Sequence, residues 1–317
     1  MKQLKHFWKL FLLAIVFSGC QLTAQEQNIL PQLSGENFNF MVAGDMGRRG
    51  ESEQQNIADL MGKMAETGKI RLLAVAGDPI HDDGVKNIND EEWKLKIENI
   101  YTAPSLHAIP WYVVSGNHEY NGSVQAILDY SNVSKRWNAP ARYFSLEQTI
   151  DSTGQKCLLV FIDTSPLIDK YRTEEKYSDA GEQDMDAQLQ WIEETLALSD
   201  ARWKIVIGHH PVYAGTNKTE SERTDLQERL NPILVKNDVD VYVCGHIHNF
   251  QHIRSEVGNV NYIVNSSASR SRPIEKNQEM LFGNPDPGFS VFSVSANNIE
   301  FYAINHTGET VYNYVIK

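Results

Sequence analysis

The sequence predicts an α/β protein built as a four-layer sandwich, with two mixed β-sheets facing each other and helices on their outer faces. Between residues 38 and 243, short apolar runs alternate with stretches of helical periodicity, an order typical of strands and helices that form buried, largely parallel sheet. From about residue 259 onward the pattern changes to β runs alone, which we expect to form a second sheet behind the first. The chain has 317 residues, of which 41% are hydrophobic and 22% charged, so it has enough apolar material for one large core.

Each element is predicted from a local pattern. In the helix expected at 54–66, the apolar residues on one face are Ile57, Leu60, Met61 and Met64. Further helices are expected at 91–101, 123–130, 184–198 and 221–236, and strands at 38–43, 72–76, 111–114, 158–162, 204–207, 239–243, 260–264 and 289–294. The last stretch, 299–316, has the pattern of a β-hairpin that turns near Gly308. The charged segment 171–184 is interpreted as a solvated connection, with a loop over a functional site as the alternative.

The N-terminal residues have the pattern of an export signal. A lysine-rich start precedes the apolar run 10–17, which is too short to span a bilayer, where a helix needs about 20 apolar residues. Ser18-Gly19-Cys20 follows and resembles a bacterial lipoprotein signal, with plain secretory cleavage after Ala24 as the alternative. We therefore expect a signal peptide at 1–19, a tether at 20–36 and one folded domain at 37–317. The protein would be exported to the periplasm or attached to the outer membrane through lipidated Cys20.

The net charge and the cysteine content argue against some binding partners and against a disulfide framework. The formal net charge is −12 at pH 7, which argues against nucleic-acid binding, because sequence-independent binding depends on a basic surface. The same charge argues against attachment to anionic lipid through electrostatics. Cys157 and Cys244 lie in apolar, strand-like runs, so we expect buried free thiols, with a single bridge between them as the alternative.

Five apolar runs end directly in a potential metal ligand with a glycine beside it. The endings are Gly44-Asp45-Met46-Gly47, Gly77-Asp78-Pro79-Ile80-His81, Gly116-Asn117-His118-Glu119, Gly208-His209-His210 and Gly245-His246-Ile247-His248. In parallel α/β sheets, ligands collect at the carboxyl ends of the strands, where glycine lets the backbone turn sharply. Carboxylate, imidazole and amide oxygen together suit Fe, Zn or Mn, whereas an all-oxygen set suits Mg or Ca. Each motif alone is weak, but all five in this order predict a metal centre.

These blocks resemble the calcineurin-like metallophosphoesterases, and most of all the small purple acid phosphatases of the tartrate-resistant type. The resemblance extends from Phe38 to His252 and includes the flanking runs 208–213 and 244–249. It implies the metallophosphoesterase form of the sandwich and the hydrolysis of small phosphate monoesters with two metal ions, each Fe, Zn or Mn. A phosphodiesterase or nucleotide hydrolase with the same metal site is the first alternative. A surface protein that binds metal without catalysis is the second.

The resemblance also implies a role for each matching residue. The first metal would be bound by Asp45 and His248, both metals by Asp78, and the second metal by Asn117, His209 and His246. A metal-bound hydroxide would attack the phosphorus, without a covalent enzyme intermediate. His118 would contact the phosphate and protonate or stabilise the leaving oxygen, a role suited to imidazole. Glu119 would orient His118 or tune its charge.

One position departs from the family pattern. Purple acid phosphatases have a tyrosine at the position of His81, whose phenolate binds ferric iron and gives the colour. Since imidazole can also bind a metal, we expect His81 to be a ligand of the first metal, with a hydrogen-bonding role as the alternative. His81 can also replace a histidine that a related pattern has at the position of Gly47. Polar side chains near these motifs are further candidates, with ordinary structural roles as the alternative. Asp82 and Asp83 could bind the metal in place of His81, Arg48 and Arg49 could bind phosphate oxygens, and His210 and His252 could contact the substrate.

Overall fold

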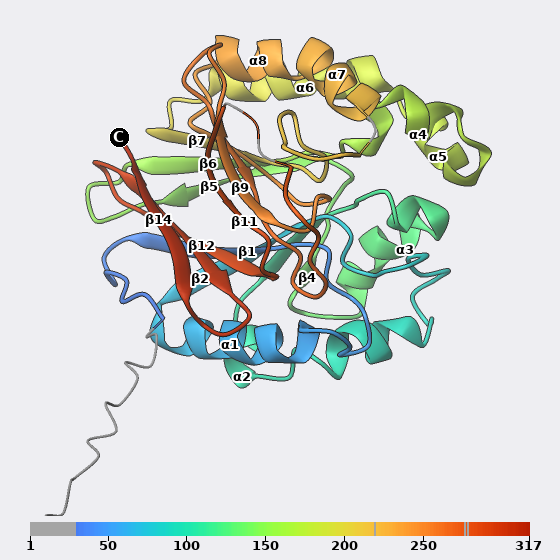
Figure 1. Cartoon of the computed structure of the whole chain (residues 1–317), viewed down its shortest axis with the longest axis horizontal. Coiled ribbons are helices and arrows are strands. Elements are labelled where there is room, and N and C mark those ends of the chain that lie inside the picture. The colour runs from blue at the N-terminus through green and yellow to red at the C-terminus, as the bar shows by residue number, and fades with distance from the viewer. Residues whose placement is uncertain (1–29, 219, 276, 278) are drawn as a thin grey trace, which may run out of the picture.

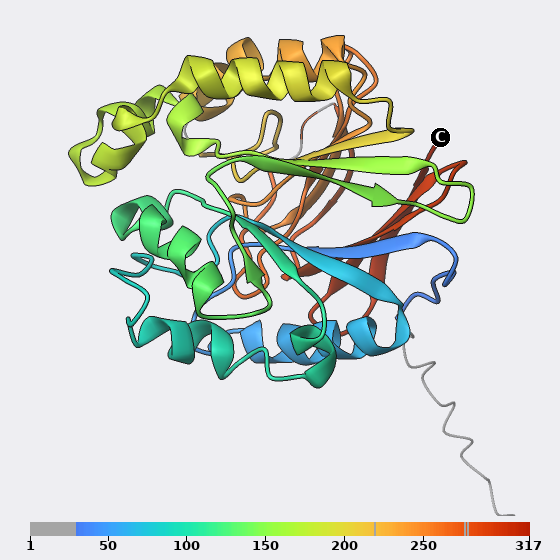
Figure 2. The same ribbon diagram turned by 180° about the vertical axis from the view of Figure 1, so that it is seen from behind.

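The computed structural model describes residues 30–317 except 219, 276 and 278. These residues form two mixed sheets of seven strands each, which face each other and carry helices on both outer faces (Figure 1, Figure 2). The four-layer sandwich expected from the sequence is therefore confirmed.

The first sheet has the strand order β14-β13-β12-β1-β2-β3-β4. Its strands are β1 (Phe38–Ala43), β2 (Ile70–Ala76), β3 (Trp111–Val114), β4 (Trp137–Asn138), β12 (Gly288–Val294), β13 (Ile299–Asn305) and β14 (Thr310–Ile316). Strands β1 to β4 are parallel, whereas β12 pairs antiparallel with β1 and is followed by the predicted hairpin. The expectation that the C-terminal β runs form a second sheet holds for the strands at 261–264 and 280–284, which lie in the other sheet, and is wrong for the last three strands. Strands β12, β13 and β14 extend the first sheet instead, because the free edge of β1 accepts β12, and Phe40 stacks on Phe292 across this pair.

The second sheet has the order β11-β9-β10-β8-β7-β6-β5. Its strands are β5 (Phe144–Thr149), β6 (Lys156–Phe161), β7 (Trp203–Ile207), β8 (Val241–Cys244), β9 (Phe250–Arg254), β10 (Asn261–Val264) and β11 (Met280–Asn284). The parallel strands β6, β7, β8 and β10 form its centre. The sequence reading missed β5, β9 and β11. Both β5 and β11 are partly exposed edge strands; polar residues interrupt the apolar pattern of β5, and only three apolar residues, Met280 to Phe282, mark β11.

Helices cover the two outer faces. On the side of the first sheet lie α1 (Gln54–Thr67), α2 (Pro104–His107), α3 (Val124–Asp129), the π-helix η1 (Lys94–Glu98) and the short 3₁₀ helix η3 (Tyr130–Asn132). The 3₁₀ helix η2 (Glu119–Asn121) reaches toward the other side, where its Tyr120 packs in the same cluster as Tyr171 and Tyr177. On the side of the second sheet lie η4 (Ser165–Leu167), α4 (Asp169–Thr173), η5 (Glu175–Tyr177), α5 (Ser178–Glu182), α6 (Met185–Leu198), α7 (Glu220–Arg229) and α8 (Asn231–Lys236). The segment 171–184, interpreted as a solvated connection, is thus largely helical.

Two predicted helices differ in extent from the structure. The helix expected at 91–101 is a shorter helical segment that contains η1. The helix expected at 221–236 is divided into α7 and α8. Pro232 lies in the first turn of α8, where a missing backbone N–H costs little, but it cannot continue the hydrogen bonds of a helix that precedes it.

Three apolar clusters fill the three interfaces between the four layers. In β1, Phe40 and Val42 belong to the cluster between the two sheets, whereas Met41 and Ala43 belong to the cluster beneath α1. A third cluster lies between the second sheet and its helices. Both faces of the parallel strands are therefore buried, which explains their nearly continuous apolar runs.

The structure tests part of what the sequence predicts for the N-terminal segments and for the cysteines. The predicted signal peptide lies outside the described residues. Leu30 and Leu33, in the last part of the predicted tether, pack against the cluster beneath α1, so the folded domain begins before residue 37. Cys157 and Cys244 are buried free thiols, as expected. Within residues 30–317, apart from the gaps named above, no helix is long and apolar enough to cross a membrane.

Candidate metal centre

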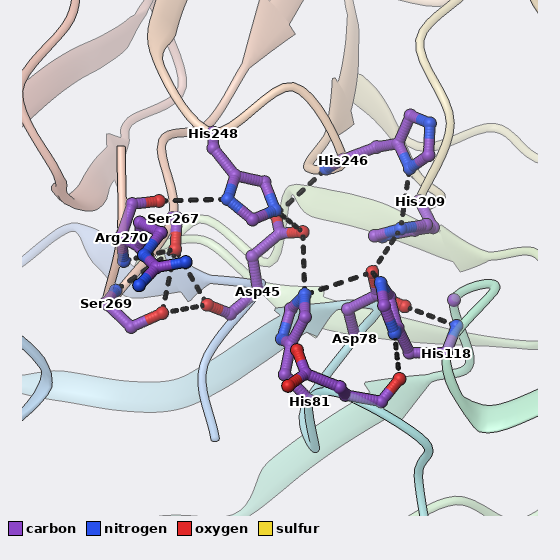
Figure 3. Close-up of polar contacts among 12 residues, drawn as sticks. Asp45, Asp78, His81, His118, His209, His246, His248, Ser267, Ser269 and Arg270 are labelled. Atoms are coloured by element: carbon purple, nitrogen blue, oxygen red, sulfur yellow. Dashed lines mark hydrogen bonds and ion pairs between the residues drawn. The ribbon is translucent and has the colours of Figure 1, made fainter. Parts of the chain in front are cut away.

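The carboxyl ends of the two sheets meet at one edge of the sandwich, and there the predicted aspartates, Asp45 and Asp78, come together with the predicted histidines (Figure 3). Asp45 follows β1 and Asp78 follows β2, whereas His209 follows β7 and His246 follows β8. Hydrogen bonds join the sheets at this edge. The backbone N–H of His246 donates to Asp45 Oδ2 at 2.9 Å, and His209 Nδ1 lies 2.9 Å from the carbonyl oxygen of Ala76.

The backbone of the site is held in an uncommon conformation. Asp45, Asp78, His246 and His248 have φ values of 52°, 48°, 69° and 63°, in the left-handed region that residues other than glycine adopt at a cost of about 1–3 kcal/mol each. Gly116 is required by close approach, because a Cβ there would lie 2.2 Å from Asp78 Oδ1. The chain therefore keeps local strain that brings ligand-type side chains to one point.

Two imidazoles face carboxylates through nitrogens that carry no proton in their neutral form. His248 Nδ1 lies 2.9 Å from the carbonyl oxygen of Arg270, so Nδ1 carries the proton and the lone pair of Nε2 faces Asp45 Oδ1, also at 2.9 Å. His209 Nδ1 is bonded to the Ala76 carbonyl in the same way, and its Nε2 lies 3.0 Å from Asp78 Oδ2. Two acceptors in such contact require a cation or a proton between them.

His246 is oriented by a side chain that the sequence reading did not identify. Its Nε2 lies 3.0 Å from Oε2 of Glu222, on α7, and its Nδ1 lies 3.2 Å from Nε2 of His209. Burial opposes ionisation of Glu222, but the charge of His210 and the hydrogen bond from Lys170 hold the pKa of this carboxyl below its ordinary value. Glu222 therefore acts as a hydrogen-bond acceptor, which places the proton of His246 on Nε2 and turns the Nδ1 lone pair toward the centre.

His81 and Asn117 bring buried polar atoms without partners. His81 is 2% exposed, and neither of its ring nitrogens has a hydrogen-bond partner among the described residues. Its Nε2 lies 3.5 Å from Asp78 Oδ2 and 4.0 Å from Asp45 Oδ1. The side-chain oxygen of Asn117 is buried and unpartnered in the same sense. Leaving such groups unsatisfied costs about 1–3 kcal/mol each, so their placement fits metal coordination better than hydrogen bonding.

The charges of these groups suit a cation. Burial opposes ionisation of Asp78, but the imidazoles of His209 and His118 hold the pKa of its carboxyl well below the ordinary value. Burial lowers the pKa of His246 well below its usual range, so that ring stays neutral. For His209, burial is outweighed by the Asp78 carboxylate, which raises the imidazole pKa to about 9. In the metal-free chain a proton therefore fills the gap between His209 and Asp78, and a metal ion has to displace it.

His118 differs from the buried imidazoles in its exposure. Its side chain is 25% exposed, Nδ1 is hydrogen-bonded to the carbonyl oxygen of Asp82, and Nε2 lies 3.8 Å from Asp78 Oδ2. His118 is close enough to Asp78 and His81 to be counted with them as a potential metal group, so proximity alone does not define its role. The open side of the ring leaves Nε2 accessible to a substrate.

The role predicted for Glu119 is corrected by its contacts. Its buried carboxyl group accepts hydrogen bonds from the backbone N–H groups of Ile80, at 3.2 Å, and Gly116, at 2.8 Å. Among the described residues it makes no hydrogen bond to His118. Burial and the Asp78 charge also raise the pKa of Glu119 well above its ordinary value. Glu119 therefore connects the loops that carry Asp78 and Asn117 and does not orient the His118 ring.

The other candidates have structural partners. Arg48 pairs with Asp82 at 3.0 Å and Arg49 pairs with Glu92, beside a charged cavity of about 500 Å³ that His81 borders. His210 lies 2.8 Å from the hydroxyl of Thr164. His252 lies behind the site, hydrogen-bonded to Tyr312 and Asn261.

The comparisons with known proteins agree with this geometry. The model of the calcineurin-like phosphoesterase family matches residues 38–250. Purple acid phosphatase 3 of Arabidopsis thaliana is 34% identical over 269 residues, which cover 82% of this chain and 71% of that protein. The chain belongs to the calcineurin-like phosphoesterases and, within them, to the purple acid phosphatases.

Further relatives span most of the chain. Purple acid phosphatase 17 of Arabidopsis thaliana is 31% identical, covering 96% of this chain and 91% of that protein. Human tartrate-resistant acid phosphatase type 5 is 29% identical, and the match covers 87% of this chain and 89% of that protein. A solved structure described as GAP50, the anchor in the inner membrane complex of Plasmodium, has a TM-score of 0.75 at 24% identity and covers 89% of both chains. At that identity the last similarity shows the fold alone.

Purple acid phosphatases use a dinuclear centre in which iron is paired with zinc or manganese. The acceptors that face one another and the unpartnered buried atoms described above fit such a centre. The ligand-type atoms also form several overlapping groups, including Asp45 with His81 and His248, and Asp45 with Asp78 and His209. The residues present therefore fit the family's metal centre.

Sequence reasoning missed the outer residues of this purple acid phosphatase site. Ser267 and Ser269 donate hydrogen bonds to the carbonyl oxygen of Asp45 at 2.8 and 2.7 Å, and Arg270 supplies the carbonyl that orients His248. The available signal was the polar run 265–272, which follows the apolar strand 260–264 as the ligand motifs follow theirs. It contains no carboxylate, histidine or cysteine, so its pattern predicts no role in a metal site. Glu222 gave no signal, because it lies in a helix rich in charge.

Proposed function

We propose that this chain hydrolyses phosphate monoesters at a dinuclear metal centre, as the names of its acid phosphatase relatives indicate for those proteins. The observation that carries the proposal is the set of buried carboxylates and imidazoles that face one another, His248 with Asp45 and His209 with Asp78. A bound cation offsets the cost of burying these charged and acceptor groups together. A metal-binding protein without catalysis would have no use for His118, a histidine held at the rim with an open nitrogen.

The residues divide into two sets around Asp78. Asp45, His81 and His248 would hold the first ion, and Asn117, His209 and His246 the second, with Asp78 shared. When bound, the two ions lower the pKa of water and offset the charge that develops on the phosphoryl oxygens. The chain itself orients the ligands through backbone carbonyls and Glu222, and excludes bulk water from the buried side of the site.

His118 is placed to act on the leaving group. The carbonyl of Asp82 fixes the Nδ1 side of the ring, so Nε2 faces the site from its solvent-exposed side. A protonated Nε2 can donate to the oxygen of a departing alcohol, and a neutral Nε2 can hold that oxygen through an intervening water.

A pair of cations favours monoesters over diesters. Lys218 donates to the carbonyl oxygen of His246 at 2.7 Å, and a guanidinium nitrogen of Arg272 lies 3.5 Å from the same oxygen. No carboxylate of the described residues forms an ion pair with either side chain. A monoester dianion carries more charge than a diester monoanion, so unpaired cations beside the site stabilise it more strongly.

The test is hydrolysis of para-nitrophenyl phosphate and its bis ester by the metal-loaded chain and by Lys218→Met. We expect the wild type to prefer the monoester and the variant to lose part of that preference, while Lys204→Met, which changes a lysine outside the site, keeps it. A wild-type preference for the diester would move the function to a phosphodiesterase. Failure to hydrolyse either ester with both metals bound would favour the non-catalytic alternative.

We further propose that the chain is exported and lipidated at Cys20, as the lysine-rich start and the apolar run 10–17 indicate. The test is to express the full chain and its Cys20→Ser variant in a bacterial host with radiolabelled palmitate. Label and membrane association in the wild type, with neither in the variant, would support lipidation. An unlabelled protein cleaved after Ala24 would support plain secretion instead.

A further inference from the structure

The two proposed metal sites receive unequal charge from their ligands. The ligands proposed for the first metal include two carboxylates, that of Asp45 and that of Asp78, which is shared between the two metals. The second set adds only neutral groups to Asp78, namely the amide of Asn117 and two imidazoles. A divalent or trivalent ion held by neutral ligands in a buried site depends on charge from the surrounding residues.

Glu222 is the buried carboxylate that meets the second set. It is 4% exposed, and its Oε2 lies 3.0 Å from Nε2 of His246, on the side of the ring away from His209. The corresponding nitrogens of His209 and His248 meet backbone carbonyls instead, at Ala76 and Arg270. Of these three imidazoles, His246 is therefore the one whose outward nitrogen meets an anion.

The other oxygen of Glu222 is fixed by two donors from α4. Lys170 Nζ lies 2.7 Å from Oε1, and the hydroxyl of Tyr171 donates to the same oxygen at 3.2 Å. The Lys170 side chain is 32% exposed, so this connection runs from the surface to His246 through one carboxylate. With Oε1 held by these donors, Oε2 is free to accept from His246.

We propose that Glu222 is a positioning residue for the second metal: it fixes His246 with its proton on Nε2 and makes Nδ1 a stronger ligand. The inference rests on the proposed role of His246. Carboxylate partners of ligating histidines raise their basicity, and loss of such a partner typically weakens metal binding by about 10–100-fold. Glu222 should act on the second ion and leave the first nearly unchanged.

The test is calorimetric titration of zinc into the metal-free chain, comparing wild type, Glu222→Gln and the matched control Glu220→Gln. Glu220 lies in the first turn of the same helix and is exposed. We expect two binding steps in all three proteins. In Glu222→Gln the zinc affinity of the second metal site should fall by about 10–100-fold, and in the control neither affinity should change. Equal affinities in all three folded proteins would overturn the proposal.

Two further measurements keep the outcomes apart. Loss of the same step in His246→Ala would show that His246 is a ligand, so that an unchanged Glu222→Gln would overturn the role of Glu222 alone. If Glu222→Gln fails to fold, nitrogen-15 spectra of the zinc-loaded wild type decide the matter. The proposal requires the proton of His246 on Nε2, and a proton on Nδ1 would overturn it.

Discussion

At the scale of single residues, the site depends on which nitrogen of each histidine faces inward. Backbone carbonyls accept hydrogen bonds from the outward N–H groups of His209 and His248, and Glu222 accepts one from the outward N–H of His246. His81 has no such partner among the described residues, although it is buried. The proposed ligands therefore comprise three histidines with fixed rings and His81, whose ring only a metal would hold, whereas His118 lies at the rim.

His118→Ala should separate catalysis from metal binding. The ring is a quarter exposed and its Nε2 is the nitrogen open to substrate, so we expect both metal ions to remain bound while turnover falls by about 10²–10⁴-fold, the usual range for a lost general acid. Metal content and kcat for para-nitrophenyl phosphate measure the two effects. Full activity, or loss of a metal, would contradict the role assigned to His118.

His81→Ala should have the opposite profile. Because both ring nitrogens are buried beside Asp45 and Asp78 without hydrogen bonds, removing the ring should weaken the first metal by more than the 10–100-fold that is typical of outer partners. Zinc titration measures this loss, with His118→Ala as the control. If the zinc affinity of the first metal site is unchanged in His81→Ala, then His81 is not a metal ligand and has a structural role.

At the scale of elements, the loops that follow the strands are packed too closely to admit new atoms. A Cβ at Gly116 would lie 2.2 Å from Asp78 Oδ1, so Gly116→Ala has to displace the shared ligand. We expect loss of metal affinity together with about 1–3 kcal/mol of stability, the usual cost of overpacking. Gly154→Ala is the control, because nothing lies within 4 Å of its added Cβ, and it should keep its metals. Normal metal binding by Gly116→Ala would show that this loop can move to accommodate the added Cβ, which would contradict the close packing of these loops.

A buried carboxyl group beyond β6 makes stability depend on pH. Asp163 accepts a hydrogen bond from Tyr120, in η2, and burial raises the pKa of its carboxyl to about 6. Because this folded value exceeds the unfolded value of 3.8, the group's stabilisation is present at low pH and is lost as pH rises through about 4 to 6.

Asp163→Asn cannot ionise, so the stability of the wild type relative to this variant should fall across that window by up to about 3 kcal/mol and then level off. Urea unfolding of both metal-loaded proteins at matched pH values measures the difference. A difference that does not change with pH would mean that Asp163 ionises in the fold without penalty.

At the scale of the whole molecule, the layers were predictable and the assignment of strands to sheets was not. Apolar runs such as Phe38–Ala43 and Trp203–Ile207 are buried on both faces, so composition alone identified them as interior strands. The partner of β1 depends on pairing with β12, about 250 residues away in the chain, and local periodicity contains no information about such a contact.

The site shows the same division between local and distant information. The ligand candidates lie in short motifs at strand ends, so their convergence could be predicted from the rule that parallel strands end at one edge. Glu222 and the carbonyl of Arg270 could not be predicted, because a glutamate in a charged helix and a backbone oxygen have no sequence pattern of their own. Glu119 was misassigned because adjacency to His118 in sequence does not bring their side chains together.

The dinuclear centre joins the two sheets, so its ions should stabilise the entire sandwich. The most direct test removes them by chelation and restores them, while metal content, thermal unfolding and monoester hydrolysis are followed on the same sample. We predict two ions per chain, a loss of about 2.7 kcal/mol of stability for each ion removed relative to metal at 100 times its Kd, and activity that disappears and returns with the ions. Unchanged stability and activity after complete removal of metal would contradict the account.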